Sequence, residues 1–260
     1  MKPLDLDQVC EYANSNIVHF HERRIASLEG LKIDRLLKKN PYLFKAKHIT
    51  TAGALIGSLL EAFLSSSEEK HFGDFLEGLA VFIAGKTCDG HKSAAQGVDL
   101  EFINKDTHYV VSIKSGPNWG NSSQHSKLAQ DLRDAVIRVQ QSRVALRVQP
   151  VLGICYGKTR TSYMKAGYLK VVEQNFWYLI SENEDLYTDI IEPIGYRAKE
   201  HNEAFYTERG RVINRFTKQF IERFCDASGA IDWARLVEFN SGNYDLDKFL
   251  SRIPRQLPMN

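Results

Sequence analysis

The chain has 260 residues, 43% of them hydrophobic, and its 34 Lys and Arg residues nearly balance 32 Asp and Glu residues, for a net charge of +2. These values exclude a disordered or low-complexity protein, and a chain of this length buries enough surface to need no disulfide or zinc ion. Its four cysteines, Cys10, Cys88, Cys155 and Cys225, form no CxxC pair, which is typical of reduced cytoplasmic thiols.

The first 95 residues have the apolar spacing of helices. We expect one helix over residues 5–30 and a shorter one over 33–37, which ends before Pro41 because the residue preceding a proline avoids the helical region. Two apolar helical stretches follow, over residues 51–67 and 71–85. The second is too hydrophobic for a surface helix, so we expect the pair to form an inner layer.

The pattern changes at residue 97, where two short runs rich in Val, Ile, Phe and Tyr, residues 97–103 and 108–116, predict a hairpin. An amphipathic helix over residues 122–147 and a buried strand over 148–157 come next. Strand, helix and strand in this order are typical of the right-handed crossover that joins parallel strands of an α/β sheet. The last hundred residues are mostly helical in pattern.

The charges are unevenly distributed. Residues 114–170 contain ten Lys or Arg residues against two acids, while residues 181–192 contain five acids and no base. The basic segment indicates either a solvated helix face or a surface for a polyanion. There is no membrane-span-length apolar run, and the acidic start of the chain differs from a signal peptide, so we expect a cytoplasmic protein without membrane contact.

Asp99 and Lys114 lie in the two strands of the predicted hairpin, where they can share one site. A carboxylate can hold Mg²⁺, and a nearby lysine can orient or deprotonate a water molecule, which together suit hydrolysis of a phosphodiester. The alternative is a cross-strand ion pair on a solvated face. Both residues have apolar neighbours in the chain, which favours a shared site.

Lys114 leads directly into a loop of small, amide and aromatic side chains that can approach a nucleic acid closely. Trp119 can stack on a base or anchor the loop, and Lys158 and Arg160 follow the strand over 148–157, where they can contact phosphate or remain solvated. His91, His108 and His125 have no metal-ligand spacing and are expected to be surface or loop histidines. The candidate DNA-binding residues are Ser115, Asn118, Trp119, Asn121, Ser122, Gln124, Lys158 and Arg160.

These residues resemble the type II restriction endonucleases of the PD-(D/E)xK nuclease superfamily. Asp99 in GVDLEF matches the first acidic element, Ser112-Ile113-Lys114 occupies the (D/E)-x-K element, and residues 73–77 are similar to the GxxxE helix of many members. Residues 109–124, 176–196 and 224–240 resemble one family within it, whose members cut interrupted GC-rich palindromes of the GGNCC type. The resemblance covers about residues 70–240.

One position departs from the family pattern, since Ser112 stands where an Asp or Glu is expected. Glu77, from the preceding helix, and Glu101, two residues after Asp99 on the same strand face, are the candidates for the missing carboxylate. Glu77 is favoured because helix glutamates are recurrent substitutes in the superfamily. If neither carboxylate reaches the metal, a catalytically degenerate DNA-binding protein becomes the better interpretation.

The resemblance implies an α/β fold with a restriction-endonuclease-like central mixed β-sheet flanked by helices, and with helical N- and C-terminal extensions. We expect a helical region for dimerisation or DNA clasping over 1–66, a nuclease core over 67–180 and a helical region packed on the core over 181–260. The expected catalytic residues are Asp99, Lys114 and Ser112, and the expected metal ligands are Asp99, Glu77 and Glu101.

The implied activity is Mg²⁺-dependent cleavage of both strands of double-stranded DNA at a short palindrome, which a homodimer matches most simply. A cognate DNA methyltransferase is implied as a genetic, not a physical, partner. Two alternatives are a sequence-nonspecific repair or recombination nuclease of the same superfamily and the degenerate binding protein.

Overall fold

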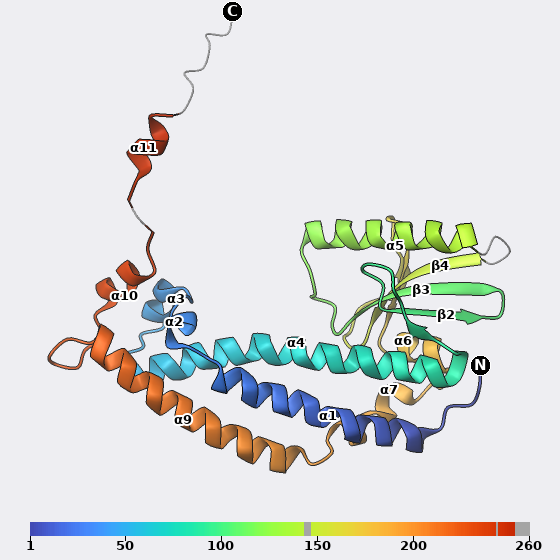
Figure 1. Cartoon of the computed structure of the whole chain (residues 1–260), viewed down its shortest axis with the longest axis horizontal. Helices are drawn as coiled ribbons and strands as arrows, with labels where there is room; N and C mark the ends of the chain where they lie inside the picture. Colours follow the sequence, from blue (N-terminus) through green and yellow to red (C-terminus); the bar gives the residue numbers. More distant parts are fainter. Residues whose placement is uncertain (143–146, 243, 253–260) are drawn as a thin grey trace, which may run out of the picture. The chain divides into compact units, whose positions relative to one another are not determined.

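The structure is a computed structural model that describes residues 1–142, 147–242 and 244–252 (Figure 1). It divides into two compact units. The first comprises residues 1–29 and 64–208, and the second comprises residues 30–63 together with the chain from residue 209 onward. The expected nuclease core, residues 67–180, belongs entirely to the first unit.

The first unit is built on a mixed β-sheet, as the sequence predicts. Its described strands lie in the order β1-β2-β3-β4-β6-β5; β3 pairs in parallel with β4 and β4 with β6, while the other neighbours are antiparallel. The parallel β3–α5–β4 crossover is therefore confirmed. The strands are β1 (His91–Lys92), β2 (Leu100–Asn104), β3 (Thr107–Lys114), β4 (Arg147–Ile154), β5 (Ser162–Tyr163) and β6 (Leu169–Val172).

Helices cover both faces of this sheet (Figure 1). Helix α5 (Ser122–Ser142) packs on one face, where its apolar side chains meet Val110, Leu152 and Val172 in one core cluster. Helix α4 (Ala52–Cys88), with α1 (Leu6–Glu29) and α6 (Gln174–Ser181), forms the second cluster on the other face. The sheet is thus enclosed on both sides, which is the arrangement expected for strands with near-continuous apolar sequences.

Helix α4 corrects one expectation. The sequence predicts two helices over residues 51–67 and 71–85, but Ala52–Cys88 form a single helix. The polar stretch between the predicted helices contains no Gly or Pro that would break a helix. Its Glu68 also accepts a hydrogen bond from Arg24 Nε of α1 at 2.7 Å, so this turn of α4 is held to its neighbour.

The first unit also contains the short helices α7 (Leu186–Asp189) and α8 (Ile191–Ile194). The second unit contains α2 (Ile33–Leu36), α3 (Pro41–Ala46), α10 (Trp233–Phe239) and α11 (Leu246–Leu250), and helix α9 (Ala198–Phe224) begins in the first unit and ends in the second. Helix α3, which the sequence analysis did not predict, starts with Asn40 capping the backbone N–H of Tyr42 and with Pro41 in its first turn. No helix in the described ranges is long and apolar enough to cross a membrane.

The register of β2 and β3 determines which side chains meet at the end of the hairpin. Leu100 pairs with Val111, so Asp99, just before β2, faces Ser112 rather than Lys114. Its backbone N–H donates to the carbonyl of Val111 at 2.9 Å, which continues the ladder by one residue. Lys114 lies two residues further along the same face of β3.

Candidate active site

Asp99 and Lys114 lie together where β3 ends. The Lys114 Nζ atom is 3.8 Å from Asp99 Oδ2 and also donates a hydrogen bond to the carbonyl oxygen of Ile113 at 2.8 Å. The side chains are only partly exposed, at 31% for Lys114 and 21% for Asp99. The two groups are thus close enough to act on one bound molecule and remain open to solvent on one side.

The Asp99 carboxylate is fixed by the opposite strand. Its Oδ2 atom accepts a hydrogen bond from the backbone N–H of Ile113 at 2.6 Å and one from the Ser112 hydroxyl at 3.3 Å. Ser112 is buried, and its neutral hydroxyl orients the carboxylate without adding a charge. Hydrogen bonds of this kind hold a carboxylate in one rotamer before any ligand arrives.

Glu77 belongs to the same neighbourhood. It lies on α4, pairs with Lys92 of β1 at 3.2 Å and lines one pocket with Lys114. The pKa of the buried Cys155 thiol is raised, chiefly by burial. The carboxylates of Glu77 and Asp99 raise it further, and Lys114 lowers it. Glu77, Asp99 and Lys114 are thus all near enough to Cys155 to influence its thiol.

The pocket, with a volume of about 730 Å³, lies between α4, the end of β3 and the loop that follows it. Of the predicted DNA-binding residues, Ser115, Asn118 and Trp119 line it. The Trp119 ring lies 5.7 Å from Lys114 Nζ and 4.3 Å from the His125 ring, so it packs within the loop and also borders the site.

Two glycines allow this loop to pack closely. A Cβ atom at Gly116 would lie 2.7 Å from the ring of Tyr156, and one at Gly157, where φ is +120°, would lie 2.7 Å from Pro117. Larger residues at either position would displace the loop after β3 from the loop after β4. The rim of the pocket is thus a rigid backbone junction.

The predicted residues at the start of α5 have a structural role. Asn121 Oδ1 accepts from the backbone N–H of Gln124, and Gln124 Oε1 accepts from the backbone N–H of Asn121, which is a reciprocal helix cap. Ser122 is exposed beside them. The cap leaves the amide nitrogens of both side chains available and fixes the start of the crossover helix.

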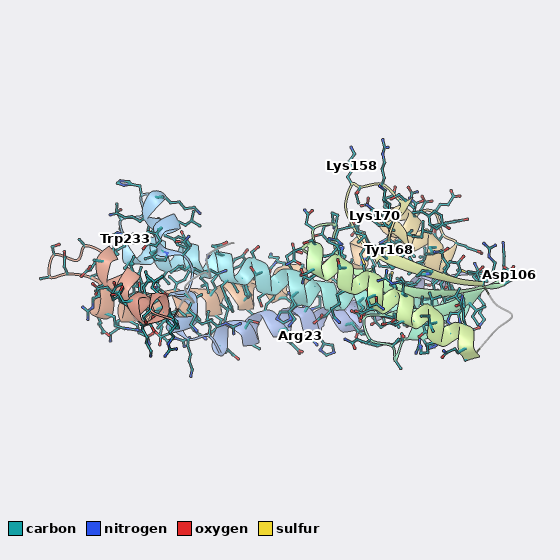
Figure 2. All side chains as sticks on the ribbon, turned by 90° about the horizontal axis from the view of Figure 1, so that it is seen from above. Arg23, Asp106, Lys158, Tyr168, Lys170 and Trp233 are labelled. Atoms are coloured by element: carbon teal, nitrogen blue, oxygen red, sulfur yellow. The ribbon has the colours of Figure 1, made fainter. Side chains whose placement is uncertain are left out.

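Lys158 and Arg160 lie outside this pocket. Both are exposed in the loop that follows β4, and Figure 2 shows the Lys158 side chain pointing away from the ribbon. Among the residues that the structure describes, neither lies within ion-pair distance of a carboxylate.

Glu101 is separated from this site by its own partners. Its buried carboxylate accepts hydrogen bonds from Ser93 at 2.5 Å and Arg138 at 2.5 Å, and Nε2 of the buried His108 lies 3.1 Å away. Burial alone would raise the pKa of Glu101, but the bonds from Ser93, Arg138 and His108 together hold it below its usual value. His108, expected at the surface, is therefore part of a buried polar cluster.

Several pocket residues were not identified from the sequence. Glu69, Lys70 and Asp74 share one face of α4 with Glu77, and Tyr156 follows β4. The Tyr156 hydroxyl donates to Glu69 at 3.4 Å, and its pKa is raised by burial and then by that carboxylate. The spacing of residues 69, 70, 73, 74 and 77 on one helical face is the signal that could have revealed them.

Several oxygen donors gather around Lys114: the carboxylates of Asp99 and Glu77, the Ser112 hydroxyl and the Ile113 carbonyl. Oxygen ligands are what Mg²⁺ prefers, and it usually needs only one or two carboxylates when phosphate is the substrate. Within the described ranges no three or more His, Cys, Asp or Glu side chains gather as a metal-binding group. The set suits a magnesium ion better than zinc.

The enclosed mixed sheet, with Asp99 just before β2, Lys114 at the end of the neighbouring β3 and basic residues in the loop after β4, defines a nuclease-like α/β protein. A family model described as type II restriction endonuclease EcoO109I matches residues 7–202. The chain belongs to this family and is therefore a type II site-specific DNA endonuclease, a hydrolase that binds DNA. No curated protein matches the chain.

Proposed function

We propose that the enzyme cuts both strands of duplex DNA at a short palindrome, in a reaction that depends on Mg²⁺ and uses the Asp99–Lys114 site. The observation that carries this proposal is the 3.8 Å approach of Lys114 Nζ to Asp99 Oδ2, with Lys114 lining a pocket that Glu77 also lines. The family relationship supports a site of the interrupted GGNCC type, because members resembling this chain cut such sequences.

Asp99 and Glu77 are the proposed metal ligands, with Ser112 orienting the Asp99 carboxylate. A bound Mg²⁺ ion would neutralise charge on the scissile phosphate and on the leaving oxygen. Asp99 is held ready for this role by the hydrogen bonds from Ile113 and Ser112. Glu101 is not included, because Ser93, Arg138 and His108 already occupy its carboxylate.

Lys114 is the proposed catalytic residue that positions the attacking water. Its ammonium group is held by the Ile113 carbonyl and stands near Asp99, so it can donate to a water molecule or to a phosphate oxygen in the same pocket. Ser115, Asn118 and Trp119 border this space and are proposed to contact the DNA strand. Lys158 and Arg160 are proposed to bind phosphates further along, since both are exposed and lie in a basic loop.

We also propose that the enzyme acts as a homodimer, because a palindrome presents two equivalent half-sites and a two-fold axis gives each strand its own active site. A DNA methyltransferase that protects the same sequence in the host genome is the proposed genetic partner.

The test is digestion of a plasmid and of phage DNA with the purified full chain in Mg²⁺, with EDTA as the control, followed by sequencing of the product ends. Discrete fragments whose ends define one short palindrome are expected in Mg²⁺ alone. A smear or nicking at DNA structures would instead favour the nonspecific nuclease. Specific DNA binding without cleavage in Mg²⁺ or Mn²⁺ would favour the degenerate binding protein.

A further inference from the structure

A second pocket, of about 640 Å³, lies beside the turn that joins β5 to β6. Its lining combines groups that can carry positive charge with aromatic and apolar side chains, and it comes from the first half of α5 and from that turn. The residues that matter here are His125, Arg133, Tyr163, Met164, Lys165 and Tyr168. Such a combination suits a nucleic acid, which offers phosphates and base edges together.

The β5–β6 hairpin is a small ribbon at the edge of the sheet. The backbone N–H of Met164 donates to Tyr168 at 2.8 Å and that of Gly167 donates to Met164 at 2.9 Å, which closes the turn. Gly167 has a φ of +92°, and a Cβ atom there would meet nothing within 4 Å. The tip therefore faces open space.

Two large side chains at this tip are exposed without apolar cover. Tyr163 is 73% exposed and Met164 is 37% exposed. The Tyr163 hydroxyl donates to Gln149 Oε1 of β4 at 3.2 Å, so its ring is held in place although it is exposed. Rigid, exposed apolar groups on a loop are typical of a binding surface.

The charge of the segment fits a polyanion. Residues 157–172 contain Lys158, Arg160, Lys165 and Lys170 and no Asp or Glu. Lys170 donates to Thr159 at 3.2 Å, and in the described part of the chain none of the four lies within ion-pair distance of a carboxylate. Their charge is thus available to an external ligand.

The hairpin pocket neighbours the candidate active site. His125, which lines it, lies 4.3 Å from the ring of Trp119, and that ring lies 5.7 Å from Lys114 Nζ. A DNA strand with one phosphate at Lys114 would therefore pass Trp119 and His125 before reaching the hairpin.

We infer that the β5–β6 hairpin determines sequence specificity: it enters the major groove and reads base pairs beside the cleaved bond with Tyr163, Met164 and Lys165. The inference rests on the proposed function. The major groove admits a two-stranded β ribbon, a lysine pairs well with the O6 and N7 atoms of guanine, and apolar side chains contact the thymine methyl group. Arg133, at the pocket's other wall, contacts the adjoining phosphates.

The test compares the base preferences of the full-length enzyme and its variants. Wild type, Lys165→Ala and Tyr163→Ala each cleave a library of random-sequence duplexes in Mg²⁺, and the product ends are sequenced. At the positions that the hairpin reads, the variants are expected to accept a wrong base about 5- to 150-fold more readily, since one base contact contributes about 1–3 kcal/mol. Lys158→Ala is the matched control, because loss of a phosphate contact weakens all sequences alike.

A binding measurement answers the same question if a variant cleaves too weakly for its product ends to be sequenced. The same substitutions in a Lys114→Ala background are compared for binding to the wild-type site and to its single-base changes, with Tyr163→Phe, which keeps the ring, as a further control. If Lys165→Ala and Tyr163→Ala keep the wild-type base preferences in cleavage or in binding, the hairpin does not determine specificity. The proposed function would remain intact. Wild-type enzyme that yields no defined ends would overturn both.

Discussion

Lys114 Nζ stands 3.8 Å from Asp99 Oδ2 although the two residues are not directly opposed in the sheet. The register places Asp99 opposite Ser112, and Lys114 reaches back along the strand, where the Ile113 carbonyl also accepts a hydrogen bond from it. This diagonal arrangement brings an acidic and a basic side chain together across the two strands. The first prediction concerns the base.

Lys114→Ala is expected to lower the cleavage rate by about 10²- to 10⁴-fold, as removal of a group that activates or positions water does in other enzymes. Salt-dependent DNA binding should remain, because a single charge is lost from a basic surface. Single-turnover cleavage and filter binding measure the two effects. Lys105→Gln, at the exposed β2–β3 turn, removes one charge elsewhere and should keep wild-type cleavage. Wild-type rates in Lys114→Ala would remove Lys114 from the mechanism.

The central elements could be predicted because their signals are local. The hairpin, the crossover helix and the following strand carry apolar patterns over seven or more residues, and the structure confirms that each of them exists. The helix expected over 122–147 ends earlier: α5 is described to Ser142, residues 143–146 lie outside the described residues, and Arg147 already belongs to β4. Strands β1, β5 and β6 were not predicted. β1 and β5 have two residues each, all exposed, so they have no alternation of apolar and polar residues to recognise. Their pairing depends on neighbours already in the sheet.

The candidate site was predictable in part. Asp99, Ser112 and Lys114 are brought together by one hairpin, so their proximity follows from a short-range pattern. The environment of Glu101 depends instead on Arg138, which is 37 residues away on α5 and donates to its carboxylate at 2.5 Å. Strand alternation places Glu101 on the same face as Asp99, but only the packing of α5 decides which partner it takes. A contact between residues this far apart in the chain produces no spacing pattern that could be recognised in the sequence.

The second prediction separates the two candidate metal ligands. Glu77→Gln is expected to raise the Mg²⁺ concentration for half-maximal cleavage by about tenfold or more, because the ion loses one of its two proposed carboxylate ligands, Asp99 and Glu77. Glu101→Gln should keep the wild-type Mg²⁺ requirement but lower the free energy of unfolding by about 1–3 kcal/mol, since Arg138 and His108 lose a charged partner. Mg²⁺ titrations of cleavage and urea unfolding of both variants measure this. The reverse pattern would make Glu101 the ligand.

The third prediction concerns Ser112, which stands where the family pattern has an acid. Ser112→Asp is expected to lower the Mg²⁺ concentration for half-maximal cleavage by about tenfold, a change of about 1.4 kcal/mol. Without Mg²⁺ the new carboxylate faces Asp99 and should lower the melting temperature, which added Mg²⁺ restores. Ser112→Asn introduces a side chain of nearly the same size as Asp but without its charge, so this variant should show neither effect. Equal Mg²⁺ curves for the Asp and Asn variants would contradict a metal beside residue 112.

The fourth prediction is a pH effect on stability centred on His21, a buried residue of α1. Its ring stacks on His201 at 4.4 Å, and Arg24 lies beside it, with its guanidinium also bound by Glu68 and Asn202. The pKa of His21 is lowered from 6.5 to about 4, chiefly by burial and in addition by the neighbouring His201 and Arg24. The folded state therefore holds this histidine neutral at a pH where the unfolded chain protonates it.

Above pH 6.5 the ring is neutral in both states and has no effect on the pH dependence. As the pH falls from 6.5 to about 4 the unfolded state gains a proton that the folded state does not, so stability should decrease by up to about 3 kcal/mol. Urea unfolding at pH 8, 6 and 5 measures the loss. His21→Gln should flatten this part of the curve, whereas His19→Gln, on an exposed face of α1, should leave it as in wild type. Equal slopes for wild type and His21→Gln would show that His21 is not the titrating group.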